Sequence, residues 1–276
     1  MLKQAMAGIL SESESEELYG AFDQIGNIII LRIPDSLIPK KKIIGEVLLD
    51  KVKTARSVYY QSSPVEGDYR IRKIELLAGE DDTETEYKEH GCRFKIDVEK
   101  TFFSPRLSTE RQRIAELIND GEVIINMFGG VGMFSIVAAK KKRCHVYNID
   151  INPTAANLCS QNIILNKKLK GTVESIEGDA AQIIEQKLSG IGDRILMLLP
   201  ERSDEFLNAA IMASKDKAVI HYYCHVHAEK KSQVSELASH HLNTVMNIRH
   251  EILGSKIVRP VGPRFYQAVV DTKISK

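Results

Sequence analysis

The chain has 276 residues, of which 43% are hydrophobic and 27% charged, and its formal net charge is +1. These values are typical of a globular protein with one large or two modest domains, and they exclude a uniformly cationic nucleic-acid binder. No apolar run approaches the ~20 residues needed to cross a bilayer, and the acidic amino-terminal segment lacks the apolar core of a signal peptide.

The first hundred residues predict a small α+β domain. Short apolar strands and one helix come first, and β-rich runs follow that we expect to form a small antiparallel sheet. Strands clustered ahead of an alternating region indicate a separate unit, which we place at residues 21–100, after an acidic segment at 1–20 that is frayed or part of a helix cap. The strands are expected at 27–33, 57–61, 69–77, 84–88 and 93–98, the helix at 36–50, and turns at 79–82 and 90–91.

From residue 101 to 276 apolar runs alternate with helical patterns. Five such alternations followed by a terminal β-hairpin predict a doubly wound α/β sheet whose last strand inserts antiparallel, as in Rossmann-like class I methyltransferases. The strands are expected at 122–126, 143–149, 173–178, 193–199 and 216–224, the helices at 133–141, 153–166, 180–188, 203–213 and 229–242, and the late β-rich runs at 245–255 and 264–273.

A glycine cluster ends the first strand of this alternating region. Gly129, Gly130 and Gly132 allow a sharp turn and a close approach of the backbone to a ligand. The next strand ends on Asp150, eighteen residues beyond Gly132, where a carboxylate is placed to accept hydrogen bonds from a ribose. The two features predict a site for an adenosine-containing cofactor. The alternative is an ordinary tight turn with an incidental Asp.

The glycine pattern also limits which cofactor is expected. It lacks the third glycine of a dinucleotide fingerprint, and the chain has no phosphate-binding loop of the G-x-x-x-x-G-K-[ST] type. A glycine bend without a phosphate cradle, followed by a ribose-binding carboxylate, suits a nucleoside without phosphates. We therefore expect S-adenosylmethionine.

Several further residues are candidates for chemistry. Glu110 lies in the first turn of a helix after Ser108, an expected N-cap, and is either a general base or a complement to the helix dipole. Leu198 and Leu199 precede Pro200 at the end of the fourth strand, where ligands of doubly wound sheets bind.

No metal is expected. His221-Tyr-Tyr-Cys-His-Val-His227 has no second ligand pair at zinc spacing, so a satisfied strand histidine is favoured. The four cysteines are scattered without disulfide or metal spacing, which favours a cytoplasmic location. Two locally basic stretches, 51–73 and 256–276, are either phosphate-binding stripes or solvated faces.

Beyond these features, the chain resembles the archaeal and eukaryotic tRNA (guanine-N1)-methyltransferases that modify position 37, beside the anticodon. The resemblance runs from about residue 20 to the C-terminus. It rests on Gly67-Asp-Tyr-Arg-Ile-Arg72, Leu77-Ala-Gly-Glu80 with Thr83-Glu-Thr85, Arg93-Phe-Lys-Ile-Asp97, Phe103-Ser-Pro-Arg106 through Glu110-Arg111, Met127 to Gly132, Ile149-Asp-Ile-Asn-Pro153 and His221-Tyr-Tyr223.

The resemblance implies a methyl transfer from S-adenosylmethionine to guanosine 37 of tRNA, bound through its anticodon stem-loop. The family's additional N-terminal domain, which grips the tRNA elbow, is not recognised in the chain. The general base falls on Glu110, and the arginine that steadies O6 of the base falls on Arg70, with Arg72 as a competitor. The expected cofactor-binding residues are Arg106, Phe128, Gly129, Gly130, Gly132, Asp150, Ile151, Asp179, Ala180 and Leu199.

The chain departs from the family pattern at three places. The acidic residue that opens the glycine motif is Asn126, the Ala and Pro of the loop are Gly129 and Met133, and the Asn of the Asn-Leu-Pro motif is Leu198. These departures keep two alternatives open. One is an aminocarboxypropyl transferase of the wybutosine pathway, a sister group with the same fold and cofactor. The other is a catalytically weak S-adenosylmethionine-binding protein that binds tRNA.

Overall fold

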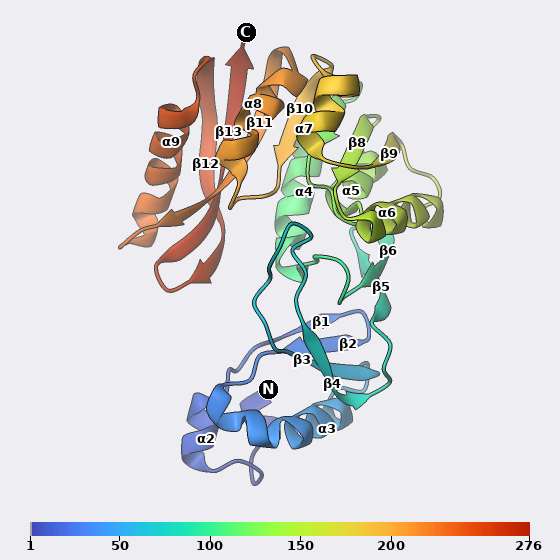
Figure 1. The fold of residues 1–276 in the computed structure, drawn as a ribbon, viewed down its shortest axis with the longest axis vertical. Helices are drawn as coiled ribbons and strands as arrows, with labels where there is room; N and C mark the ends of the chain where they lie inside the picture. Colours follow the sequence, from blue (N-terminus) through green and yellow to red (C-terminus); the bar gives the residue numbers. More distant parts are fainter. Residues whose placement is uncertain (1) are drawn as a thin grey trace. The chain divides into compact units, whose positions relative to one another are not determined.

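The chain divides between Pro105 and Arg106 into two units in a computed structural model, which describes residues 2–276 (Figure 1). We call residues up to Pro105 unit 1 and those from Arg106 onward unit 2. Met1, the first residue of the expected acidic segment, lies outside the described residues.

Unit 1 is built on a four-stranded sheet in the order β1-β2-β3-β4. β2 and β3 are parallel and the outer pairs are antiparallel. A parallel pair needs a crossover connection, and the helix between the two strands supplies it. The bounds are β1 Phe22–Ile25, β2 Ile28–Leu31, a 3-10 turn η1 Asp35–Lys40, α3 Lys41–Lys51, β3 Ser57–Gln61 and β4 Ile74–Gly79.

The acidic amino-terminal segment is part of unit 1 rather than set apart from it. Two short helices, α1 (Leu2–Ala5) and α2 (Glu12–Glu17), precede β1. Ser11 caps α2 and forms a reciprocal capping box with Glu14. Leu2 and Leu18 are almost fully buried and pack in the same core as the apolar residues of β2 and α3.

The small antiparallel sheet expected near 69–98 forms only in part. β5 (Glu84–Glu89) and β6 (Cys92–Asp97) make a two-stranded hairpin. Its expected turn is present, because His90 and Gly91 both have positive φ, as a tight hairpin turn requires. The third expected strand is wrong in two respects. β4 starts at Ile74 instead of 69, and it pairs with β3, so it belongs to the four-stranded sheet.

Unit 2 has a seven-stranded sheet in the order β12-β13-β11-β10-β7-β8-β9. Five strands are parallel, and β13 runs antiparallel between β11 and β12. This confirms the predicted Rossmann-like methyltransferase sheet with its antiparallel insertion. The strands are β7 Val123–Asn126, β8 His145–Asp150, β9 Thr172–Glu177, β10 Gly192–Met197, β11 Ser214–His227, β12 Arg249–Gly262 and β13 Phe265–Ser275.

Two sets of helices cover this sheet. One set packs on the central strands in a single apolar core and consists of α7 (Ala180–Ile183) with the π-helical turn η3 (Ile184–Leu188), α8 (Ser203–Ala213) and α9 (Val234–Val245) after the short turn η4 (Lys231–Gln233). The other set follows the short turn η2 (Pro105–Leu107) and consists of α4 (Ser108–Leu117), α5 (Met133–Lys141) and α6 (Pro153–Leu165). In this set α5 and α6 contact β8 and β9, and α4 packs against α5. Within residues 2–276, no helix combines the length and apolarity needed to span a membrane.

Burial of the amino-terminal segment generates a stability prediction. Leu18 is 1% exposed within the core of unit 1, so Leu18→Ala should lower the free energy of unfolding by about 2–5 kcal/mol. Ile43→Ala, at a 42% exposed site of α3 in the same unit, is the matched control and should change little. Urea unfolding followed by circular dichroism, with hydrogen exchange to localise the change to unit 1, measures the effect. Equal effects of the two variants would contradict the packing described.

Candidate active site

The glycine loop lies at the carboxyl end of β7, beside the end of β8. The Gly130 N–H donates to Oδ2 of Asp150 at 2.6 Å, and Oδ1 of Asp150 accepts the Asn152 N–H at 2.9 Å. Gly130 and Gly132 have positive φ values of 54° and 88°, which favour glycine. The loop and the carboxylate that the sequence separates by eighteen residues are therefore in direct contact.

A buried polar cluster is hydrogen-bonded to this loop. Asn126 donates from Nδ2 to the Ser135 hydroxyl at 3.1 Å, and that hydroxyl donates to Oδ1 of Asn148 at 2.6 Å. Nδ2 of Asn148 in turn donates to the Gly130 carbonyl at 3.3 Å. All three side chains are fully buried, and Oδ1 of Asn126 has no hydrogen-bond partner among the described residues. Through these hydrogen bonds, side chains of β7 and β8 hold the loop in place.

Gly129 has a packing role in the same cluster. A Cβ at this position would lie 2.1 Å from Oδ1 of Asn148, which is closer than real Cβ atoms approach other atoms. Asn148 is held by Ser135 and by the Gly130 carbonyl, so it has no room to move aside. With Asn148 in this place, position 129 has room for a glycine but not for the alanine of the family.

The remaining expected cofactor residues lie in unit 2 as follows. Phe128 is half-buried and stacks edge-on against Phe206, and Ile151 is 41% exposed beside Asp150. Asp179 caps α7 by accepting the Gln182 N–H at 3.0 Å, with Ala180 buried behind it. Leu199 belongs largely to the apolar core, and Arg106 is exposed on η2.

These residues fit an adenosine group. The loop brings backbone amides and the Asp150 carboxylate together at the carboxyl ends of two neighbouring strands, where ligands of such sheets bind. The exposed side chain of Ile151 adjoins that carboxylate and offers apolar contact. No lysine or arginine is placed in the loop from 127 to 132 to bind a phosphate, which suits a nucleoside.

Glu110 is buried in the first helical turn of unit 2. Its side chain is 4% exposed, and both oxygens are engaged: Oε1 accepts from the Tyr223 hydroxyl and from Arg113, both at 2.7 Å, and Oε2 accepts from Arg113 at 3.0 Å. Lys256 lies 3.2 Å from Oε2. The expected cap is wrong, because Ser108 is the first helical residue and the N-cap is Leu107 without a side-chain cap bond. The carboxylate faces a side-chain network rather than the helix end.

That network continues through the sheet. Arg113 also binds Asp271 of β13, which accepts at 2.6 Å from Nδ1 of His221. On the other side of the imidazole, Arg194 lies 2.7 Å from Nε2 and donates to both oxygens of Glu122. An arginine only donates, so Nε2 must accept, and His221 is neutral with its proton on Nδ1. Sequence analysis identified His221 as a satisfied strand histidine but missed Arg113, Asp271 and Arg194.

The charges of the network follow from burial and pairing. Burial lowers the pKa of His221, opposed by Asp271, and this agrees with the neutral tautomer. Burial and the neighbouring Glu110 raise the pKa of Tyr223 well above its usual value, so its hydroxyl stays a donor. Burial disfavours charge on both Asp271 and Arg113, but their hydrogen bonds outweigh it, lowering the pKa of Asp271 and raising that of Arg113.

Arg70 and Arg72 occupy different environments in unit 1. Arg72 is 9% exposed and donates to the Phe103 carbonyl at 3.0 Å and to Gln61 at 3.4 Å, which is a structural role. Arg70 has a positive φ of 52° in the turn before β4, and its guanidinium lies 4.1 Å from the centre of the Phe102 ring. A strained backbone and a cation–π contact are more typical of a functional site.

Several side chains of the two basic stretches are paired within the chain. In the first, Lys53 pairs with Asp50 at 2.9 Å and Arg56 with Asp82 at 2.8 Å. In the second, Arg259 donates to Gln267 and Arg264 pairs with Glu229. Most of these side chains are therefore held by neighbours in the same chain.

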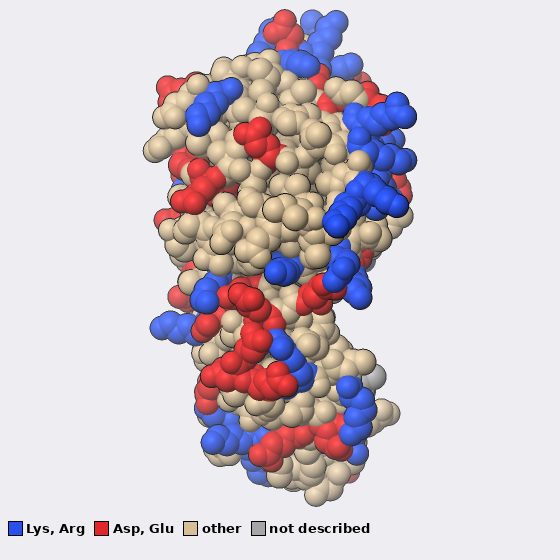
Figure 2. Space-filling model, turned by 90° about the vertical axis from the view of Figure 1, so that its right-hand side faces the viewer, with Lys and Arg blue, Asp and Glu red and all other residues tan. Residues whose placement is uncertain are grey.

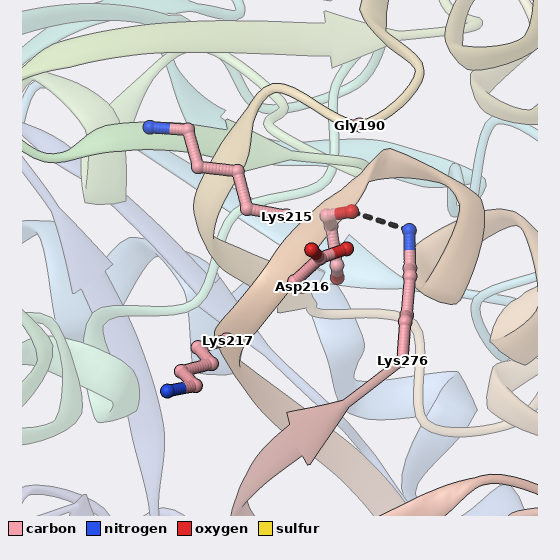
Figure 3. A pocket seen from close by; sticks show the side chains of 6 residues that line it. Gly190, Lys215, Asp216, Lys217 and Lys276 are labelled. Atoms are coloured by element: carbon pink, nitrogen blue, oxygen red, sulfur yellow. Dashed lines mark hydrogen bonds between the residues drawn. The ribbon is translucent and has the colours of Figure 1, made fainter.

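A hollow of ≈ 550 Å³ lies where β11 begins, at the end of the parallel strands opposite to the glycine loop. Figure 3 shows Lys215 and Lys217 pointing apart there, while Lys276 reaches the Ser214 carbonyl. Lys215 is paired with Asp193 at 2.8 Å. The hollow is remote from the glycine loop, and its lysines are largely satisfied. Within the described residues no cluster of His, Cys, Asp or Glu has the makings of a metal site.

The match between Gly129 and Asn148 generates a double-mutant prediction. Gly129→Ala should destabilise unit 2 by about 1–3 kcal/mol and weaken S-adenosylhomocysteine binding, because the added methyl overpacks a fixed site. Adding Asn148→Ala should recover part of the loss, giving a coupling energy of about 0.5–3 kcal/mol. Thermal unfolding and calorimetric titration measure both quantities. Additive costs of the two substitutions would show that the residues are independent.

Buried, neutral His221 generates a pH prediction. Its folded pKa lies below its ordinary value of 6.5, so below that pH the unfolded state binds a proton that the folded state does not. Stability should therefore fall from about pH 6.5 downward, by at most about 1.4 kcal/mol per pH unit. Unfolding midpoints between about pH 7.5 and about pH 5.5 measure the slope. His221→Gln should flatten it, and His240→Gln, at an exposed position, should not. An unchanged slope in His221→Gln would refute the assignment.

Comparison with known proteins places the chain in a family. Residues 85–248 match the TRM5/TYW2 methyltransferase domain, and residues 2–83 match the TYW2 N-terminal domain. The tRNA (guanine(37)-N(1))-methyltransferase Trm5b of Pyrococcus abyssi is 40% identical over 260 residues, 92% of this chain and 75% of that protein. The tRNA 4-demethylwyosine(37)-methyltransferase Taw21 of Saccharolobus solfataricus is 35% identical over 262 residues, 94% and 96% of the two chains.

Solved structures of Trm5 proteins are also similar to this chain. The structure of aTrm5 in complex with tRNALeu has a TM-score of 0.85 at 33% identity, covering 99% of this chain and 78% of that one. That of Methanocaldococcus jannaschii Trm5 in complex with adenosine has a TM-score of 0.80 at 32% identity, covering 96% and 77%. With a domain match over more than half of its length and these relatives, the chain belongs to the TRM5/TYW2 methyltransferase family, as its motifs predicted.

Proposed function

We propose that the protein transfers a methyl group from S-adenosylmethionine to N1 of guanosine 37 in tRNA. The observation that carries the proposal is Glu110, a buried carboxylate oriented by Arg113 and Tyr223 in the unit that holds the glycine loop. The names of the Trm5b relative and of the aTrm5–tRNALeu complex support the substrate, and the adenosine complex supports the cofactor. The four cysteines are buried and form no disulfide among the described residues, and a cytoplasmic location is proposed.

In this proposal Glu110 is the general base. Guanine N1 carries a proton at neutral pH, so it becomes a nucleophile only when a carboxylate removes that proton. The bound S-adenosylmethionine supplies an electrophilic methyl carbon on its sulfonium sulfur. Arg113 and Tyr223 hold the carboxylate in one orientation before the transfer.

The cofactor is assigned to the glycine loop. Gly129, Gly130 and Gly132 provide the close backbone approach, and Asp150 accepts from the ribose hydroxyls. Phe128, Ile151, Ala180 and Leu199 are proposed as apolar contacts, Asp179 as a polar contact to the adenine, and Arg106 as a contact to the carboxylate end of the cofactor.

The tRNA contact is assigned to the anticodon stem-loop. Arg70, with its positive φ in unit 1, is proposed to stabilise the target base at O6, and unit 1 from about residue 21 to 100 to contact the stem-loop. Further phosphate contacts are available in unit 2, where two adjacent turns are joined by bonds from Lys170 and Gly171 to the Ala139 carbonyl. These turns carry Lys140, Lys141, Lys142, Arg143, Lys167, Lys168 and Lys170.

The charge along one side of unit 2 fits a polyanionic partner. On the face shown in Figure 2, basic side chains gather along one side of unit 2, whereas acidic side chains dominate a patch of unit 1. Such local stripes steer a nucleic acid even when the net charge of a chain is near zero.

A second candidate is methyl or aminocarboxypropyl transfer to a tricyclic guanosine derivative at the same position. Leu198 favours it, because an apolar side chain stands where the family's Asn would bind the base edge. The TYW2 N-terminal match and the Taw21 relative point the same way.

Mass spectrometry of nucleosides tests the assignment. Purified protein and S-adenosylmethionine are incubated with tRNA that carries either guanosine or 4-demethylwyosine at position 37. We expect 1-methylguanosine from the first tRNA, and product from the second tRNA alone would establish the second candidate. Glu110→Gln should lower the single-turnover rate by about 10²–10⁴-fold, with S-adenosylmethionine binding retained. Glu116→Gln, an exposed carboxylate of the same helix, is the control. An unchanged rate in Glu110→Gln would remove it as the base.

A further inference from the structure

Among residues 2–276, Lys256 is the one partner of Glu110 whose side chain is substantially exposed. It reaches Oε2 at 3.2 Å from β12, with its side chain 42% exposed, whereas the carboxylate is 4% exposed. Arg113 already binds both oxygens of that carboxylate. Lys256 is thus a solvent-accessible cation in direct contact with a buried, paired carboxylate.

The charges around Glu110 balance only when this lysine is included. Glu110 and Asp271 are two anions, Arg113 and Lys256 are two cations, and His221 is neutral because Arg194 donates to its Nε2. When Glu110 takes up a proton, the cluster carries one excess positive charge. Arg113 remains paired with Asp271, so the excess lies on Lys256.

Guanine develops the complementary charge. In the transfer the N1–H proton goes to Glu110 and the N1 electron pair forms the bond to the methyl carbon. The pair of the breaking S–CH₃ bond stays on sulfur, which becomes a thioether. As the proton leaves N1, negative charge builds on O6, and it is lost again as the new bond forms. N1 and O6 are joined through one carbon, so a donor at hydrogen-bond distance from the carboxylate oxygen that takes the proton can also reach O6.

We propose that Lys256 is a catalytic residue that donates to O6 of the target guanine and stabilises its developing charge. The assignment rests on the proposed methyl transfer to N1. It gives the site a donor where the family's amide at Leu198 is missing, and that donor comes from the same unit as the base.

An ion pair without a catalytic role predicts a different outcome. If Lys256 only neutralised Glu110, its removal would favour the protonated carboxylate and move the acid limb of the pH–rate profile, leaving the high-pH plateau unchanged. If it donates to O6, the plateau itself must fall, because the transition state loses a hydrogen-bond donor to the developing charge.

The test compares Lys256→Met, Lys256→Arg and Lys217→Met. Lys217, exposed at the end of the parallel strands opposite to the glycine loop, controls for the loss of one positive charge. Single-turnover methylation of unmodified tRNA is measured with saturating S-adenosylmethionine between about pH 6 and about pH 9. Binding of tRNA and of S-adenosylmethionine and the unfolding midpoint are measured alongside.

We expect Lys256→Met to lower the plateau rate by about 10²–10³-fold, with binding and stability near those of the wild type. Lys256→Arg should recover much of the rate, and Lys217→Met should not differ from the wild type. A shifted acid limb with an unchanged plateau, or equal losses in Lys256→Met and Lys217→Met, would overturn the role of Lys256 while leaving the methyl transfer intact. A wild-type protein that forms no 1-methylguanosine would overturn the proposed function and this role with it.

Discussion

The bridge that Arg113 makes between Glu110 and Asp271 is the interaction on which the site depends. Glu110 and Arg113 lie on the first helix of unit 2, and Asp271 lies on its last strand, 158 residues further along the chain. Asp271 then binds His221, and Arg194 ties that histidine to Glu122. Breaking a buried ion pair leaves an uncompensated charge, so the whole chain of contacts resists displacement of Glu110. A general base must be held in a fixed position, because a displacement of about 1 Å can lower the rate about 100-fold.

The cofactor loop shows how departures from a family pattern can compensate one another. Asn126 in place of an acid, Gly129 in place of alanine and the fully buried Asn148 occupy one cluster. An alanine at 129 would collide with Asn148, and the asparagine holds the loop carbonyl of Gly130. The loop keeps its contact with Asp150 by this different set of bonds. No residue of the loop replaces the amide that is lost with Leu198, and Lys256 is proposed to supply that hydrogen-bond donor.

Features set by local sequence patterns were predicted, whereas features that depend on contacts between distant residues were not. Helices α5 and α8 have the predicted bounds, and the contact of the glycine loop with Asp150 followed from periodicity and from the rule that ligands bind at strand ends. Strand β4 was misplaced because the turn around Arg70 continues its apolar pattern, and its partner strand depends on tertiary packing. Asp271 and Lys256 were missed because only the fold of β12 and β13 brings them to Arg113 and Glu110. Arg113 alone had a local signal, its spacing of three residues from Glu110 on a helix.

The most direct measurement is a crystal structure of the protein with S-adenosylhomocysteine and an anticodon stem-loop that carries guanosine at position 37. We expect an unstacked guanine whose N1 lies within hydrogen-bond distance of a Glu110 oxygen and whose O6 lies within hydrogen-bond distance of Lys256, with Arg113 still bridging Glu110 and Asp271. A guanine bound away from Glu110, with the carboxylate still closed off by Lys256, would contradict this expectation.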